Sequence, residues 1–178
     1  MKINHLVGAF LCVLGCYSCS SPKTEVKSPD GHIKMSFTVD ENGRPLYNVS
    51  VGDSLFIENS VMGFTEANGV SLADGFQIKS TTFDSKDETW TQPWGENKMN
   101  RNHYNEMAVN LTNGSQVELT LRFRVFDDGV GFRYEYNVPT ADSLMITDEL
   151  TTFRFRQDGT SWSIPASAET YELLYKQQ

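Results

Sequence analysis

Hydrophobic and polar residues alternate one by one along most of the chain after residue 30. In residues 33–39, IKMSFTV, every second side chain is apolar, which is the period of a strand with one buried face. The same period runs through YNEMAVNL (104–111), VELTLRFRVF (117–126) and VGFRYEYNV (130–138). Turn-forming residues separate such segments at Asn42-Gly43, Asn113-Gly114-Ser115 and Asp127-Asp128-Gly129. Because a helical period does not persist outside a weak pattern at the C-terminal end, we predict an all-β fold, an antiparallel β-sandwich.

The spacing of the last two hairpins predicts their strand register. A two-residue loop at Asp128-Gly129 would place Val125 opposite Phe132 and align one apolar face across both strands. In the preceding hairpin, a three-residue loop would place Val109 opposite Leu119, and such a loop usually carries a bulge. Both predicted registers therefore depend on the length of the loop.

The polar face of the last hairpin would then carry two like charges side by side. The predicted register sets Arg124 directly opposite Arg133, which lowers stability unless an acid lies between the two guanidinium groups. We therefore expect one carboxylate to lie within salt-bridge distance of both arginines. The candidates are Glu106, Glu135 and Glu149.

Residues 1–19, MKINHLVGAFLCVLGCYSC, have the pattern of a secretory signal peptide. One early cation, Lys2, precedes an apolar run over 6–14, and this run is too short to span a bilayer as a permanent helix. The sequence VLGC at 13–16 resembles a bacterial lipobox, so we expect Cys16 to be lipidated; the alternative is ordinary signal cleavage just after Cys19. The expected location is the periplasm, or the outer membrane through a lipid anchor, of a Gram-negative bacterium.

The rest of the chain is expected to be a polar tether over residues 20–29 and one domain over 30–178. A chain of 178 residues is about one domain long. All three cysteines lie at or before residue 19, so the mature domain has no disulfide framework, although it is expected in an oxidising compartment.

The charge of the chain excludes one class of partner. The formal net charge is −8, from 15 basic and 23 acidic residues, whereas nucleic-acid binding requires a basic face. We therefore expect no nucleic-acid partner, and membrane contact only through the lipid anchor.

The stretch WTQPWGENKMNRNHYNEMAV, residues 90–109, is the main candidate for ligand contact. Exposed aromatic rings beside acids and amides suit a sugar, whose C–H face stacks while its hydroxyl groups form hydrogen bonds. The alternative is that the tryptophans close one end of the sandwich while the basic residues satisfy buried carbonyl groups. The candidate carbohydrate or interface residues are Trp90, Trp94, Glu96, Arg101, His103 and Tyr104.

Two groups of acids could also carry chemistry. Asp127 and Asp128 could act as an acid/base pair on a glycosidic bond, but a hairpin turn favours aspartate for its local hydrogen bonds. Glu169 and Glu172 lie three residues apart, yet calcium requires about six to eight oxygen ligands. From the residues alone, these two glutamates are interpreted as a solvated acidic edge.

Several long stretches, in order along the chain, resemble the N-terminal domain of glycoside hydrolase family 97, α-glucosidases and α-galactosidases of the Bacteroidetes type. The resemblance runs from residue 28 to the end, and no single motif carries it. The stretches are SPDG (28–31), GRPLYNVSV (43–51), SVMGF (60–64), ETWTQPWGENKMNRNHYNEMAV (88–109), LRFRVFDDGVGFRYEY (121–136), and WSIP followed by YELLY.

The resemblance implies a function that is shared with another domain. It implies an exo-acting α-glycosidase in which a super-β-sandwich packs on a (β/α)8 barrel that carries the catalytic carboxylates. It also implies a Ca2+ ion held mostly by barrel glutamates and by one sandwich glutamate, which falls at Glu172 in WSIPASAETYE. In this family the stretch containing Trp90 and Trp94 lies in the sandwich that supports the barrel, so both are expected at that contact.

We therefore expect residues 30–178 to be a truncated sandwich, incomplete at its C-terminal end and inactive alone. Its expected partners are the barrel of the same parent enzyme and, through that parent, an α-linked oligosaccharide. One alternative is a self-standing lipoprotein that binds glycan through the Trp90/Trp94 loop. A weaker alternative is a small enzyme that uses Glu96, Glu106 or the Asp127-Asp128 pair.

Overall fold

The computed structural model describes residues 23–139, 142–164 and 175–178, and within these ranges all regular structure is β-strand. Within the same ranges, no helix is long and apolar enough to cross a membrane. The strands are β1 (Glu25–Lys27), β2 (Ile33–Val39), β3 (Pro45–Val51), β4 (Ser54–Val61), β5 (Phe64–Glu66), β6 (Gln77–Thr91), β7 (Met99–Thr112), β8 (Glu118–Val125), β9 (Val130–Asn137), β10 (Ile146–Glu149), β11 (Trp162–Ser163) and β12 (Lys176–Gln177).

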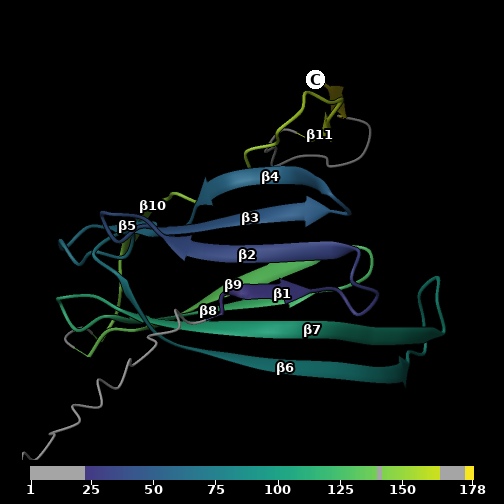
Figure 1. Ribbon diagram of the computed structural model, residues 1–178, viewed down its shortest axis with the longest axis horizontal. Helices are drawn as coiled ribbons and strands as arrows, with labels where there is room; N and C mark the ends of the chain where they lie inside the picture. The colour runs from purple at the N-terminus through teal and green to yellow at the C-terminus, as the bar shows by residue number, and fades with distance from the viewer. Residues whose placement is uncertain (1–22, 140–141, 165–174) are drawn as a thin grey trace, which may run out of the picture.

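Two antiparallel four-stranded sheets lie face to face and enclose the core. The strand orders are β1-β2-β3-β4 and β6-β7-β8-β9, and Figure 1 shows the two sheets as separate layers. Their inner side chains meet directly: the ring centroids of Phe37 and Phe123 are 5.8 Å apart, and those of Tyr47 and Phe132 are 5.4 Å apart. The predicted all-β sandwich is therefore confirmed.

The alternation seen in the sequence is the alternation of burial in the structure. In β2, Ile33, Met35 and Phe37 are buried while the residues between them are only partly covered. In β8 all four apolar positions are buried, and these are Leu119, Leu121, Phe123 and Val125. Successive side chains of a strand point to opposite faces, so one local pattern decided which face of each sheet became the core.

Both predicted registers are wrong by two residues because each turn is centred one residue away from its expected position. Val125 pairs with Val130, and Phe123 rather than Val125 pairs with Phe132. In the preceding hairpin, Val109 pairs with Leu121 rather than with Leu119. A shift of two preserves the face of every side chain, so the apolar row stayed in the core although each residue gained a different partner.

The asparagine at the start of the β7–β8 loop explains the position of that turn. The Asn113 side-chain oxygen accepts hydrogen bonds from the backbone N–H groups of Ser115 and Val117, both at 3.0 Å. Gln116 adopts a φ of 61° within this loop. The Asn113 N–H also donates to the Val117 carbonyl at 3.1 Å, so the three-residue loop spans 114–116 rather than the predicted 113–115.

Part of the expected polar tether belongs to the sandwich. Strand β1 pairs with β2, with Val26 opposite Met35, and Val26 is buried in the core. The Ser28 side chain is also buried and accepts a hydrogen bond from the backbone N–H of Ile33 at 2.9 Å. The packed domain therefore begins before residue 30.

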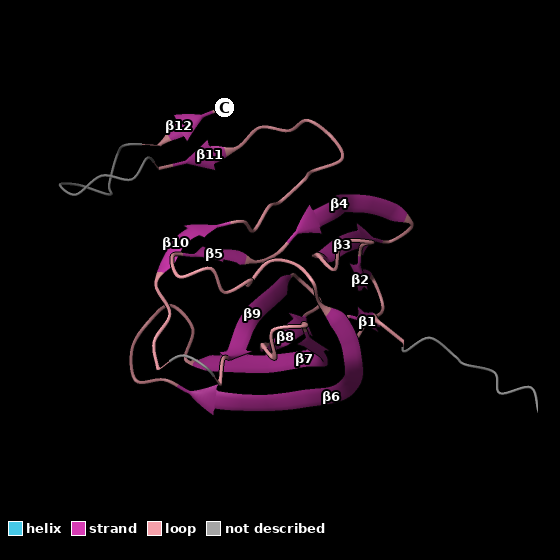
Figure 2. Cartoon of the chain, turned by 90° about the vertical axis from the view of Figure 1, so that its left-hand side faces the viewer, coloured by secondary structure: helices cyan, strands magenta, loops and turns pink. Residues whose placement is uncertain are grey.

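Two small sheets and one extended segment complete the described fold. Strand β10 pairs with β5, and β11 pairs with β12. Figure 2 shows the C-terminus next to β12. The segment 152–156 runs along the outer edge of β4. The backbone N–H of Glu58 donates to the Arg154 carbonyl at 2.8 Å, and the backbone N–H of Arg156 donates to the Phe56 carbonyl at 3.1 Å. This segment covers backbone groups that an edge strand would otherwise expose.

Candidate functional site

The main candidate stretch forms a two-stranded ribbon that extends past the rest of its sheet. Strand β7 pairs with β8 only from Asn105 onward, whereas its pairing with β6 continues to Met99 opposite Thr91. Residues 86–91 and 99–104 therefore form a projecting ribbon, which Figure 1 shows as the long hairpin end of β6 and β7. The two tryptophans lie at or beyond its tip.

Strand alternation places the candidate residues on two opposite faces of this ribbon. Trp90, opposite Asn100, shares one face with Tyr104, opposite Lys86. Arg101 and His103 occupy the intervening positions of β7 and so face the other way. The six candidates therefore do not form one cluster. In a continuous strand, residues an odd number of positions apart face opposite sides, so the spacing of these residues separates them.

The tip of the ribbon carries exposed aromatic side chains. Trp94 is 84% exposed and Trp90 is 48% exposed, and Glu96 is also exposed in the loop between the strands. The Gln92 N–H donates to the Lys98 carbonyl at 3.1 Å and closes this loop. Exposed indole rings held on a hydrogen-bonded loop are available to a partner surface or to a ligand.

The basic residues of the other face are paired with carboxylates. Arg101 donates to both carboxylate oxygens of Asp87, at 2.8 and 2.7 Å, and this bidentate contact holds the pKa of Asp87 below its usual value. The His103 Nδ1 atom lies 3.9 Å from Asp127 Oδ2. These partners are carboxylates, not the buried carbonyl groups of the alternative interpretation.

Tyr104 is a packing residue at the point where the ribbon leaves the sheet. Its side chain is buried, and its ring lies 5.3 Å from that of Phe126. The guanidinium of Arg124 lies over the same ring, 4.4 Å from the centroid, in cation–π geometry. Tyr104 therefore anchors the base of the ribbon.

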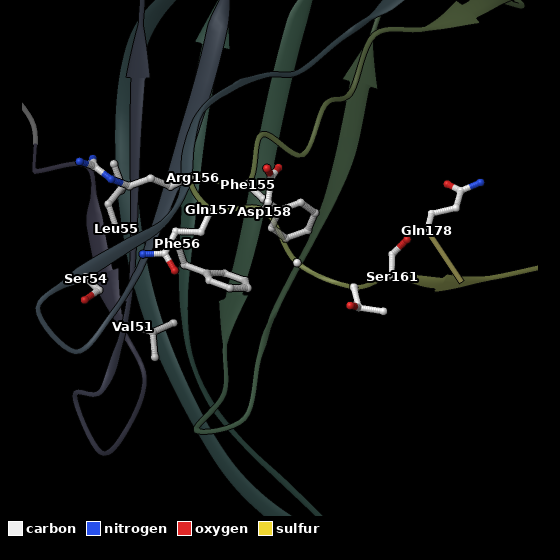
Figure 3. A pocket seen from close by; sticks show the side chains of 12 residues that line it. Val51, Ser54, Leu55, Phe56, Phe155, Arg156, Gln157, Asp158, Ser161 and Gln178 are labelled. Carbon is white, nitrogen blue, oxygen red and sulfur yellow. The ribbon is translucent and has the colours of Figure 1, made fainter. Parts of the chain in front are cut away.

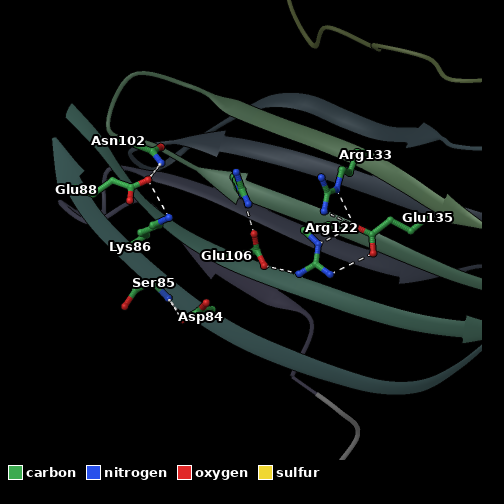
Figure 4. Close-up of polar contacts among 10 residues, drawn as sticks. Asp84, Ser85, Lys86, Glu88, Asn102, Glu106, Arg122, Arg133 and Glu135 are labelled. Atoms are coloured by element: carbon green, nitrogen blue, oxygen red, sulfur yellow. Dashed lines mark hydrogen bonds and ion pairs between the residues drawn. The ribbon is translucent and has the colours of Figure 1, made fainter. Parts of the chain in front are cut away.

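Beside this anchor, arginine and glutamate side chains form an ion-pair network on the outer face of β7, β8 and β9 (Figure 4). Glu106, which is only 6% exposed, pairs with Arg122 at 2.5 Å and with Arg124 at 2.7 Å. Glu135 pairs with Arg122 at 2.9 Å and with Arg133 at 2.6 Å. Burial opposes ionisation of Glu106, but hydrogen bonds from Arg124 and Arg122 outweigh it and hold the pKa of this carboxyl below its ordinary value.

The predicted like-charge pair exists, but its members differ. Arg122, not Arg124, lies directly opposite Arg133, and Glu135 contacts both members of that pair. The prediction that one acid contacts Arg124 and Arg133 is wrong, because Arg124 pairs with Glu106 and Arg133 with Glu135. The two-residue register error accounts for the exchange.

Asp127 lies in the β8–β9 turn and has a structural contact there. The Phe126 N–H donates to the Gly129 carbonyl at 2.8 Å across the β8–β9 turn. The Asp127 carboxylate accepts a hydrogen bond from the Asp30 N–H at 2.9 Å and so ties this turn to the start of the sandwich. These contacts favour the turn interpretation of the pair over acid/base chemistry.

A second candidate site, which the sequence did not predict, lies between β4 and the segment that follows β10. It is a hollow of about 830 Å3, and Figure 3 shows Phe56 and Phe155 among the side chains that line it. The centroids of these two rings are 5.5 Å apart, in edge-to-face geometry. Both rings are more than half exposed, at 53% and 60%. The alternation in FRFRQDG, residues 153–159, is the sequence signal that could have identified this segment as extended along a sheet edge.

Glu172 and Cys16 lie outside the residues that the structure describes. Within the described ranges, no group of three or more His, Cys, Asp or Glu side chains comes together as a metal site.

Most of the chain matches one known protein family. The family described as "Glycosyl-hydrolase 97 N-terminal" matches residues 26–178. This range includes both main sheets apart from Glu25, the first residue of β1. The chain belongs to this family. The start of the match at residue 26 agrees with the position of β1, and the resemblance drawn from the sequence is confirmed.

Solved structures of family 97 enzymes share this fold. A variant of the Pseudoalteromonas sp. strain K8 enzyme, solved with panose, is 34% identical with a TM-score of 0.76, and the match covers 86% of this chain and 24% of that one. The same enzyme solved with acarbose gives the same identity and TM-score over 87% and 24%. A β-arabinopyranosidase is 26% identical with a TM-score of 0.73, over 82% of this chain and 23% of the other. The chain thus spans about a quarter of the length of each of these solved structures.

Proposed function

We propose that this glycosyl hydrolase 97 N-terminal domain belongs to an exo-acting α-glycosidase, an α-glucosidase or an α-galactosidase. The proposed role of the domain is to pack on the (β/α)8 barrel that performs the chemistry. The Pseudoalteromonas relative supports an α-linked substrate, because that enzyme was solved with panose and with acarbose. The β-arabinopyranosidase shares the fold as well, so the sandwich by itself does not select the sugar.

The observation that carries this proposal is the exposed aromatic tip of the projecting ribbon. Trp90, Trp94 and Met99 are 48%, 84% and 60% exposed and lie together at one end of a hydrogen-bonded hairpin. Large exposed aromatic side chains of this kind are enriched in protein interfaces and contribute most of the binding energy there. We infer that the ribbon tip contacts the barrel.

The proposed contribution to catalysis is indirect. We propose that Glu172 supplies one carboxylate oxygen to the Ca2+ of the intact enzyme, with the other ligands coming from the barrel. One or two protein oxygens cannot satisfy a calcium ion, so the isolated domain would bind Ca2+ only weakly.

The test is tryptophan fluorescence of the full chain in two titrations. Addition of a separately produced catalytic barrel from a family 97 enzyme is expected to change the emission with a saturable midpoint, whereas panose is expected to leave it unchanged. The change should weaken strongly in Trp94→Ala. It should persist in the control Trp162→Ala, because Trp162 is similarly exposed, at 65%, but lies on β11.

The second candidate function is a self-standing glycan-binding lipoprotein. The 84% exposure of Trp94 favours it, because a free indole face can stack on a sugar ring. In that case panose itself would shift the emission of the isolated chain, and Trp94→Ala would abolish the shift. Such a result, without association with the barrel, would replace the first proposal by this one.

We also propose that the protein is exported to the periplasm and anchored through Cys16. The supporting pattern is VLGC at residues 13–16. Metabolic labelling with a fatty acid in a bacterial host should mark the wild-type protein and not Cys16→Ser, whereas labelling of both proteins would contradict the assignment.

A further inference from the structure

Three arginines surround an open position on the outer face of the β6–β9 sheet. Arg122 and Arg124 are alternate residues of β8, and Arg133 lies on the adjacent strand β9. Arg122 is directly opposite Arg133, and Arg124 is directly opposite Gly131. The glycine therefore stands where any other residue would extend a side chain between the guanidinium groups.

The carboxylates of this network do not balance its cations. Two glutamates, Glu106 and Glu135, pair with three arginines, which leaves a local charge of +1 in a chain whose net charge is −8. All three nitrogens of Arg122 are occupied, at 2.9, 2.5 and 3.2 Å from the two glutamates. Arg124 instead donates to Glu106 through Nε alone, and no described residue accepts from its two terminal amino groups.

The free amino groups of Arg124 are held in a fixed orientation beside a cavity. The guanidinium is fixed from below by Tyr104, whose ring centroid is 4.4 Å away, and from the side by Glu106 at 2.7 Å. A hollow of about 150 Å3 adjoins it, lined by Arg122, Arg124, Phe126, Gly131, Phe132 and Arg133. A Cβ built on Gly131 would meet no atom within 4 Å.

We propose that this hollow binds a carboxylate, which accepts hydrogen bonds from the two terminal amino groups of Arg124 and lies beside the charge of Arg133. A guanidinium donates two parallel hydrogen bonds to the two oxygens of a carboxylate. One surplus positive charge matches the single negative charge of this group better than the charge of about −2 on a phosphate monoester. The carboxylate can come from a small organic acid or from an aspartate or glutamate side chain of another polypeptide.

The test is NMR titration of the 15N-labelled full chain with sodium acetate, at an ionic strength held constant with sodium chloride. The Gly131 amide and the Arg124 Nε–H signals are expected to shift with saturation in the millimolar range. A capped peptide with one aspartate side chain is the second probe. Tighter binding of the peptide would assign the carboxylate to a polypeptide, and equal or weaker binding to a small acid; either supports the site.

Gly131→Val is the decisive variant because it fills the hollow without changing any charge. Valine is favoured in strands and meets open space at this position, so the fold is expected to persist while acetate affinity falls at least about tenfold. The control Gly129→Ala, in the adjacent turn and also with nothing within 4 Å, should leave affinity unchanged. Linear shifts in the wild type, or equal affinity in Gly131→Val, would overturn the proposal.

Discussion

Glu106 shows how one residue can connect three strands. It lies on β7 directly opposite Arg124 of β8 and also reaches Arg122, which in turn contacts Glu135 of β9. A carboxylate that is 6% exposed is tolerated because two guanidinium groups replace the water it has lost. Its removal would leave two arginines without their shared partner.

Glu106→Gln is therefore expected to lower the free energy of unfolding by about 2 kcal/mol, since the lost pair is buried on the acid side and partly solvated on the arginine side. Urea denaturation of the purified chain would measure this difference. The matched control is Glu118→Gln, whose partner Lys79 is 3.5 Å away and whose side chain is 52% exposed. The control should change stability by less than about 0.5 kcal/mol, and equal effects of the two variants would contradict this assignment.

The lowered pKa of Glu106 should also make the stability of the fold depend on pH. Because the pKa of folded Glu106 lies below its ordinary value of 4.5, its ionised form stabilises the fold above that pH. This contribution is lost as the pH falls below 4.5 toward the folded pKa. Between about pH 6 and about pH 3.5, the wild type should lose more stability than Glu106→Gln. Parallel curves from denaturation at several pH values would remove Glu106 as the cause.

At the scale of elements, the turn between β2 and β3 positions the segment that leads into β6. Gly43 has a φ of 76°, and its carbonyl accepts a hydrogen bond from the Phe76 N–H at 3.0 Å. Asp40 holds the turn by accepting from the N–H groups of Asn42 and Arg44, at 2.9 and 2.8 Å. Two backbones thus approach closely at a position where only glycine fits.

Gly43→Ala is expected to lower the free energy of unfolding by at least about 3 kcal/mol, because the left-handed backbone conformation alone costs about 1–2 kcal/mol and the new Cβ would lie 2.5 Å from the Phe76 nitrogen. Thermal and urea unfolding would measure it. Gly31→Ala is a matched control, with a φ of 78° and no atom within 4 Å, and should show the conformational cost alone. Similar losses in both variants would mean that the close approach contributes nothing.

At the scale of the whole molecule, large apolar side chains are exposed in two separate groups. One group is at the ribbon tip, with Trp90 and Trp94, and a second is along the edge of β4, with Phe56, Phe153 and Phe155. Exposed apolar patches of this kind are typical of surfaces that contact another domain or a ligand. This distribution agrees with a domain that is about a quarter of the length of its family 97 relatives.

The full chain alone is expected to hydrolyse neither p-nitrophenyl α-glucoside nor the α-galactoside, because Glu106, one carboxylate of the small-enzyme alternative, is held by two arginines. Release of p-nitrophenol, followed by absorbance, would be the measurement, with a family 97 enzyme as the positive control. Hydrolysis above the buffer rate that disappears in Glu106→Gln would instead support the small-enzyme interpretation.

The sequence by itself determined strands such as β2, β8 and β9, the face that each of them buries, the sandwich class and the family. Period-two alternation acts residue by residue, so Met35 and Phe123 were assigned to the core without knowledge of their partners. The long stretches around residues 88–109 and 121–136 likewise carried the family resemblance, which the match over residues 26–178 confirms.

Tertiary structure alone decided which residues meet. The Asn113 side chain moved one turn by one residue, and the exchange of Arg124 for Arg122 opposite Arg133 followed from a one-residue displacement of the turn in the other hairpin. The separation of Trp90 from Arg101 onto opposite faces required the ribbon to be a continuous strand pair. Alternation is a local property of the chain, whereas register and edge contacts depend on free-energy differences among pairings of distant residues, which no single segment encodes.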